Sequence, residues 1–145
     1  MPTYNYEPPD INYQHPNGDT DLMLAVLVRN YALVTQLMHL GADPNIENND
    51  GDSAILFACK NNDPRMVSLL CSLCDELYGE HELQEFVNHV HITGITPLMV
   101  AAFYSRPSYN ILRNYGADEF IRDNSGNTAD DYLQPVEQPL RYRVI

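Results

Sequence analysis

The chain has 145 residues, of which 20 are acidic and 8 basic, so its formal net charge is −12. This surplus of carboxylates repels phosphate backbones and argues against nucleic acid as a partner. Hydrophobic residues make up 44% of the chain and charged residues 19%, which is typical of one folded domain. No apolar run approaches the roughly 18 residues of a membrane span, so we expect no membrane contact.

The N-terminal residues 1–15 are rich in tyrosine and contain the pair Pro8-Pro9. They have neither helical nor alternating periodicity, which predicts an extended leader. Its tyrosines either cap the first folded unit or form a docking peptide.

The first unit, predicted at residues 16–48, opens with Gly-Asp-Thr-Asp-Leu at 18–22. A threonine at this place can cap a helix by accepting a bond from a free backbone N–H. Leu33, Val34, Leu37 and Met38 then recur at the spacing of one apolar helix face. Gly41 follows, and glycine readily ends a helix in the left-handed conformation. The pattern predicts two helices joined by a turn.

The second unit, predicted at residues 49–91, opens at Gly51, 33 residues after Gly18, but the next turn glycine comes 43 residues later. Ten extra residues therefore lie in this unit, near 74–83. In one interpretation they lengthen or interrupt the second helix. In the other, Leu83, Phe86, Val87 and Val90 lie on one face of a short helix at 82–90, after Gly79.

The third unit, predicted at 92–123, carries the clearest pattern, Gly-Ile-Thr-Pro-Leu-Met-Val-Ala-Ala at 94–102. Proline at the first helical position loses no hydrogen bond, and Leu98 lies on the same face as the alanines. The next glycine, Gly126, comes 32 residues after Gly94, so one residue is missing, most simply in the turn at 105–108. A fourth unit at 124–134 is cut short by Pro135 and is expected to cap the array with two aspartates, before an irregular tail at 135–145.

These units resemble ankyrin repeats, which have a Thr-Pro-Leu-His-x-Ala signature and a period of about 33 residues. The resemblance covers residues 16–134 and implies an all-α solenoid of stacked helical hairpins with short β-hairpin-like turns, three repeats and a truncated C-terminal capping repeat. The signature histidine is absent, since Met23, Leu56 and Met99 stand at its place. Apolar contacts must therefore replace the polar ladder between repeats.

The three cysteines are Cys59, Cys71 and Cys74. Their odd number, with no secretory signal, indicates a reducing compartment, and we expect the protein in the cytoplasm, alternatively that of a host cell. Cys71 and Cys74 lack a second pair at zinc-site spacing, so all three are expected to fill space as small hydrophobes. The alternative is a metal site completed by a nearby histidine, His81, His89 or His91.

No phosphate-binding glycine loop, nucleophile elbow or nucleotide fingerprint occurs in the chain. Adjacent carboxylates at 50–52 and 130–131 fall at predicted turns, where solvation accounts for them. We therefore expect no enzyme activity, no catalytic residue, no metal and no cofactor.

The ankyrin resemblance implies that a partner docks on a concave surface made by the hairpin tips and the first helix of each unit. Mapped onto this chain, the residues expected there are Asn17, Asp19, Leu27, Val28, Asn49, Asp50, Asp52, Lys60, Asn61, Ile92, Thr93, Ile95, Phe103, Tyr104, Asn124 and Asn127.

Among these residues the large groups Ile95, Phe103 and Tyr104 are the expected anchors of binding. The implied function is an adaptor or scaffold, monomeric when free, that binds another protein, one with a basic patch in particular. The alternative is an inhibitor or immunity-type binder, or a bacterial effector, in which the acidic face and the insertion block a partner enzyme's basic site.

Overall fold

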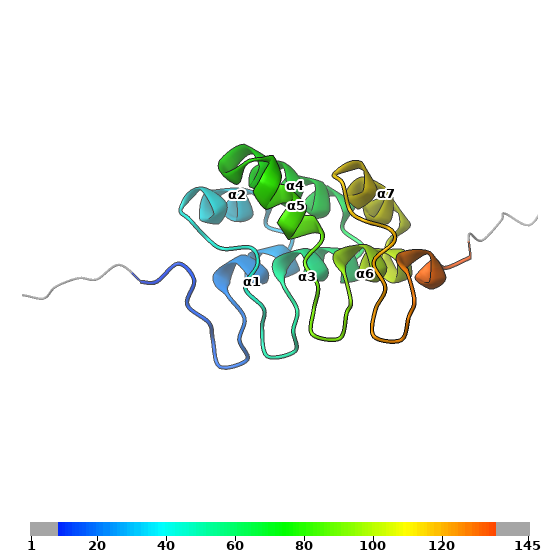
Figure 1. The fold of residues 1–145 in the computed structure, drawn as a ribbon. Coiled ribbons are helices and arrows are strands. Elements are labelled where there is room, and N and C mark those ends of the chain that lie inside the picture. The colour runs from blue at the N-terminus through cyan, green and yellow to red at the C-terminus, as the bar shows by residue number, and fades with distance from the viewer. Residues whose placement is uncertain (1–8, 136–145) are drawn as a thin grey trace, which may run out of the picture.

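The structure, a computed structural model, describes residues 9–135. Its helices form two layers, with the hairpin loops projecting from the inner layer (Figure 1). The described residues contain no strand, so the predicted all-α architecture of stacked helical hairpins is confirmed. The inner helices are α1 (Asp21–Leu27), α3 (Ala54–Lys60) and α6 (Pro97–Tyr104). The outer helices are α2 (Tyr31–His39), α4 (Pro64–Tyr78), α5 (Glu80–Val87) and α7 (Arg106–Asn114), and the 3-10 helix η1 (Ala129–Tyr132) closes the array.

The helix starts follow the capping residues in the sequence. Thr20 and Thr96 accept hydrogen bonds from the backbone N–H groups of Met23 and Met99, each at 3.3 Å. Proline occupies the first turn of α4, α6 and α7. These local signals set where α1, α4, α6 and α7 begin.

The turn between paired helices differs in the third unit. Arg29 and Asn62 hold left-handed backbone angles, with φ of 58° and 49°, between the helices of the first and second units. In the third unit Ser105 alone separates α6 from α7, serving as C-cap of one and N-cap of the other. The one-residue deletion expected from the glycine spacing therefore lies in this turn.

The insertion of the second unit combines the two interpretations of the sequence. Helix α4 is lengthened to 15 residues and ends at Gly79, where φ is 90° and α5 begins. The amphipathic helix thus spans Glu80–Val87 rather than 82–90. Asn88 resumes the repeat, since its Oδ1 accepts from Asp118 N at 2.7 Å as Asn12 Oδ1 accepts from Asp43 N at 2.8 Å.

The core runs continuously between the units. Leu98, expected there, is 1% exposed, and Met23, Leu56 and Met99 are buried where the signature histidine would stand. Cys59, Cys71 and Cys74 are buried as well, which confirms that they fill space in the core. Apolar side chains thus take over contacts between units.

The N-terminal end of the array begins before the expected boundary. Part of the expected leader is already structured, because Ile11 packs against the core and Asn12 binds Asp43. The rest of the leader, residues 1–8, and the tail from residue 136 lie outside the described residues. At the other end η1 packs on α6, where the sequence predicted a cap.

Candidate functional site

The four hairpins share one geometry. Each is closed by a pair of backbone bonds, as in the first hairpin, where His15 N donates to Asp19 O and Gly18 N donates to His15 O. The hairpins project from α1, α3, α6 and η1 (Figure 1). We call the exposed side of these inner helices, η1 and the adjoining hairpins the concave surface.

Two asparagines join neighbouring hairpins. Asn49 donates its backbone N–H to Asn17 O at 3.0 Å and its side-chain amide to Pro16 O at 3.0 Å. Asn124 repeats both contacts on the third hairpin, with Thr93 O and Ile92 O, each at 3.2 Å. The first and second hairpins, and the third and fourth, therefore form two pairs.

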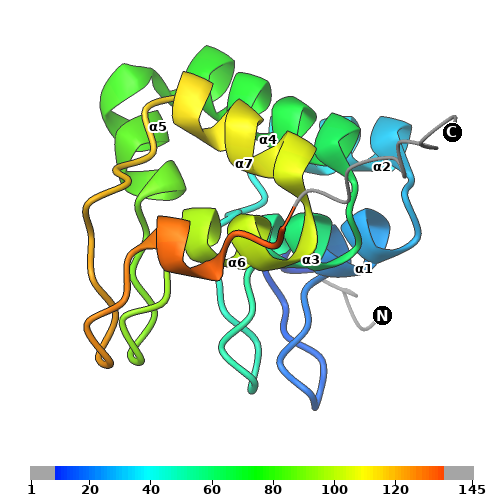
Figure 2. The same cartoon turned by 90° about the vertical axis from the view of Figure 1, so that its right-hand side faces the viewer.

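The second and third hairpins are not joined in this way, because Ile92 stands where the second and fourth hairpins have Asn49 and Asn124. No backbone hydrogen bond links these two tips within residues 9–135, and Figure 2 shows them farther apart than the other neighbouring tips. The ring of His91 lies instead against Gly51, where an added Cβ would come within 1.9 Å of Nε2. Ile92 itself is 88% exposed.

Most residues expected on the concave surface are accessible there. Asp19 is the exception, since it is 8% exposed. Its carboxylate accepts from the side-chain amides of Asn17 and Asn48, both at 2.8 Å. Asp19 therefore holds the first hairpin to the second, and burial removes it from the docking residues. The exposed members are Asn17, Leu27, Val28, Asn49, Asp50, Lys60, Ile92, Thr93, Phe103, Tyr104 and Asn124, and the half-buried ones are Asp52, Asn61, Ile95 and Asn127.

A cavity of about 270 Å³ opens on the third unit. The rings of Phe103 and Tyr104 stand edge to face beside it, with centroids 4.8 Å apart and an interplanar angle of 69°. Both side chains are about half exposed. We call this hollow the aromatic cavity. It is lined by Ile95, Met99, Val100, Phe103, Tyr104 and Tyr132.

The sequence predicted three of these lining residues and missed the other three. Met99 and Val100 lie on the buried side of α6, and from the sequence they are indistinguishable from core residues. The replacement of the signature histidine by Met99 was the available signal for an apolar floor. Tyr132 comes from η1, which the sequence identified only as a cap, so its approach to α6 depends on tertiary packing.

Tyr132 is held in place by the fourth hairpin. Its hydroxyl donates to the Asp123 carboxylate and accepts from Asn127 Nδ2 at 3.3 Å. The bond from Tyr132 lowers the pKa of Asp123 and raises the pKa of Tyr132. The pair therefore stays a carboxylate and a neutral phenol at neutral pH, with the ring fixed at the edge of the aromatic cavity.

The charges on the second unit's part of the surface are paired. Lys60 Nζ lies 2.6 Å from Asp52 Oδ1, and the Asp52 carboxylate is the better shielded partner. Lys60 is therefore a paired cation rather than a free one.

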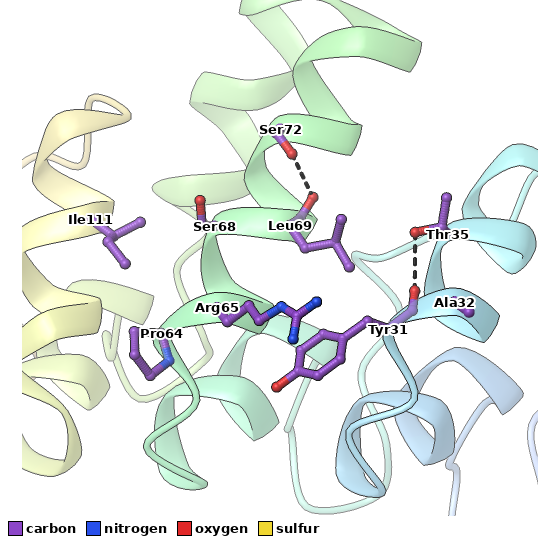
Figure 3. Close-up of a pocket in the computed structure, with 9 residues that line it drawn as sticks. All are labelled: Tyr31, Ala32, Thr35, Pro64, Arg65, Ser68, Leu69, Ser72 and Ile111. Atoms are coloured by element: carbon purple, nitrogen blue, oxygen red, sulfur yellow. Dashed lines mark hydrogen bonds between the residues drawn. The ribbon is translucent and has the colours of Figure 1, made fainter.

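A larger cavity of about 590 Å³ lies on the outer layer between α2, α4 and α7 (Figure 3). The Arg65 guanidinium stacks over the Tyr31 ring at 4.2 Å, and Tyr31 donates to the Asp63 carboxylate at 3.0 Å. The hydroxyls of Thr35 and Ser72 donate to carbonyls of their own helices. Most polar groups here are thus satisfied within the fold, so we favour the aromatic cavity as the site.

The three cysteines are buried as free thiols in the folded protein. Burial raises the pKa of Cys71 to about 12 and that of Cys74 to about 11, and raises the pKa of Cys59 further still. Since the thiolate is the nucleophile and the metal ligand, the neutral thiols serve as core packing.

None of the helices within residues 9–135 has both the length and the apolar character needed to cross a bilayer.

Comparisons with known proteins agree with the geometry. The family described as "Ankyrin repeats (3 copies)" matches residues 22–123. Protein lin-12 of Caenorhabditis elegans is 38% identical over 94 residues, which are 64% of this chain and 6% of that protein. Regulatory protein SWI6 of Kluyveromyces lactis is 41% identical over 58 residues, 40% of this chain and 7% of that protein. The chain therefore spans only a small part of the length of these relatives.

Proposed function

The chain belongs to the ankyrin-repeat family, and from this premise we propose that it is a non-enzymatic adaptor or scaffold that binds another protein through its concave surface. Ankyrin repeats generally mediate contacts between proteins. The observation that carries the proposal is the aromatic cavity, because large exposed side chains around an apolar hollow are the usual anchors of an interface. We further propose that the protein acts in the cytoplasm and is monomeric when free.

The proposed docking surface extends from the aromatic cavity to the tip of the third hairpin and to the second unit. Ile92 and Thr93 at the third tip are exposed, and Phe103 and Tyr104 are exposed on α6, the helix that follows this hairpin. We propose that the partner spans these residues and reaches the paired Asp52 and Lys60. Asn49 and Asn124 contribute less to the partner because their amides already join hairpins.

The test is site-specific crosslinking in cells. A photoreactive phenylalanine analogue at Thr93 is expected to capture a partner, whereas the same group at Ser72, exposed on α4, is not. Phe103→Ala and Tyr104→Ala should each abolish the capture from Thr93. The matched control is Tyr78→Ala, since Tyr78 is 44% exposed on the outer layer. Capture from Ser72 alone would place the partner elsewhere and contradict the proposal.

An inhibitor is the second candidate, favoured by the acidic insertion. No lysine or arginine occurs between Arg65 and Arg106, and the exposed end of α4 with α5 presents carboxylates to which a basic active site is complementary. These are Asp75, Glu76, Glu80, Glu82 and Glu85. The captured partner decides between the two functions: an enzyme whose activity falls on binding identifies an inhibitor, and unchanged activity within a larger assembly identifies an adaptor.

A further inference from the structure

We infer that the aromatic cavity receives an arginine side chain from a basic segment of the partner. This inference rests on the proposed function and names the chemistry that the concave surface selects.

The cavity has an aliphatic floor and an aromatic rim. Ile95, Met99 and Val100 supply the floor, and the rings of Phe103, Tyr104 and Tyr132 stand around it. A long side chain with an apolar stem and a charged tip fits this division, because the stem can lie on the floor while the tip meets ring faces. A purely aliphatic anchor would use only the floor.

The rim is electron-rich. A cation is attracted to the face of an aromatic ring by its quadrupole. The Tyr132 hydroxyl donates to the ionised Asp123, which draws negative charge onto the phenol and strengthens that attraction. Asp131, the exposed neighbour of Tyr132 in η1, adds a second carboxylate at the same end of the array.

Several cations within residues 9–135 already bind other groups. Lys60 is paired with Asp52 at 2.6 Å, and Arg122 donates to Gly126 O at 2.7 Å on the fourth hairpin. Helix α6 itself carries no charged residue. Arg106, on α7, is the nearest cation that follows α6 in the chain. The Asp123 carboxylate bonded to Tyr132 and the neighbouring Asp131, in a chain with a net charge of −12, favour a cationic side chain at the cavity.

Arginine suits the cavity better than lysine. Its guanidinium is planar, weakly hydrated and able to stack on a ring while still donating hydrogen bonds. The same chain already holds this contact elsewhere, where Arg65 lies 4.2 Å above the ring of Tyr31. Phe103 and Tyr104 stand at 69° to each other, so a guanidinium can stack on one ring and meet the edge of the other.

The experiment is a titration of the isotope-labelled full chain, followed by NMR, with the acetylated and amidated pentapeptides Gly-Gly-Xaa-Gly-Gly. Xaa is arginine, lysine or leucine. We expect the arginine peptide to shift the signals of Phe103, Tyr104 and Tyr132 with the lowest dissociation constant, and raising the salt concentration to weaken it. Phe103→Leu and Tyr104→Leu, which keep apolar bulk, should each weaken arginine binding about 2- to 5-fold, the usual range of an exposed cation–π contact. Tyr78→Leu is the control.

Three outcomes would overturn the inference. They are a leucine peptide that binds as tightly as the arginine peptide, arginine binding that is unchanged in the Phe103→Leu and Tyr104→Leu variants, and an arginine peptide that does not shift the cavity signals. A preference for leucine, or no shift with any peptide, refutes arginine recognition but leaves partner docking intact. Docking itself fails only if the crosslink at Thr93 captures nothing that depends on Phe103 and Tyr104.

Discussion

The imidazole of His91 lies against Gly51 at the junction of the second and third hairpins, where a Cβ on Gly51 would come within 1.9 Å of Nε2. This contact replaces the asparagine link that joins the other neighbouring hairpins. The array therefore consists of two hairpin pairs that meet through this contact and through the bond between His89 Nε2 and Glu47 Oε1 at 2.8 Å.

Gly51→Ala is expected to destabilise the protein more than Gly126→Ala. Both residues have positive φ, 79° and 83°, and alanine in the left-handed region costs about 1–2 kcal/mol. Of these two glycines, only Gly51 has atoms of another residue close to the place of an added Cβ. The Gly51 variant therefore also suffers overlap with His91, which typically costs about 1–3 kcal/mol. Urea unfolding measures both losses. In the His91→Ala background the excess at Gly51 should disappear, and equal losses for the two glycine variants would contradict the contact.

Leu98→Ala is expected to lower the free energy of unfolding by about 2–5 kcal/mol, the usual effect of emptying a buried leucine site. Leu98 is 1% exposed on α6, between the second and fourth units. The control is Ile92→Ala, because Ile92 is 88% exposed and surface changes usually stay within about 0.5 kcal/mol. Chemical denaturation gives both values, and a small loss at Leu98 would mean that the stacking register is wrong.

The protein is expected to lose stability as the pH rises from about 10 to 12, and Tyr109 is one cause. Burial and the bond to Asp130 raise the pKa of Tyr109 from 10.0 to about 12. The folded state then keeps a proton that the unfolded state releases, so this contribution is complete below pH 10 and falls as the pH approaches the folded pKa. Denaturant titrations at several pH values should give a shallower decline for Tyr109→Phe. An unchanged slope would refute the contribution of Tyr109.

The thiols of the native protein should resist alkylation by iodoacetamide near pH 8. Burial raises the pKa of Cys71 to about 12 and of Cys74 to about 11, so the reactive thiolate is scarce and Cys59 is equally enclosed. Mass spectrometry should find three adducts after unfolding in urea and none before it. Fast alkylation of the folded chain would show that α4 opens readily.

Part of the candidate site was readable from the sequence and part was not. Ile95, Phe103 and Tyr104 were expected on the concave surface because their places follow from the turn glycine and the inner helix. Tyr132 was missed because its distance from α6 along the chain says nothing about the packing of η1 onto that helix. Asp19 was misjudged because its burial depends on Asn48, which comes from the next hairpin.

The sequence by itself determined the period, the helix starts and the face that each inner helix buries, since glycine turns, threonine and proline caps and apolar spacing act within a few residues. Only the tertiary structure decided which hairpins are joined, where α5 lies and how Tyr132 completes the aromatic cavity. These features arise from contacts between units about 30 residues apart, and a local pattern carries no information about which distant side chain fills the space beside it.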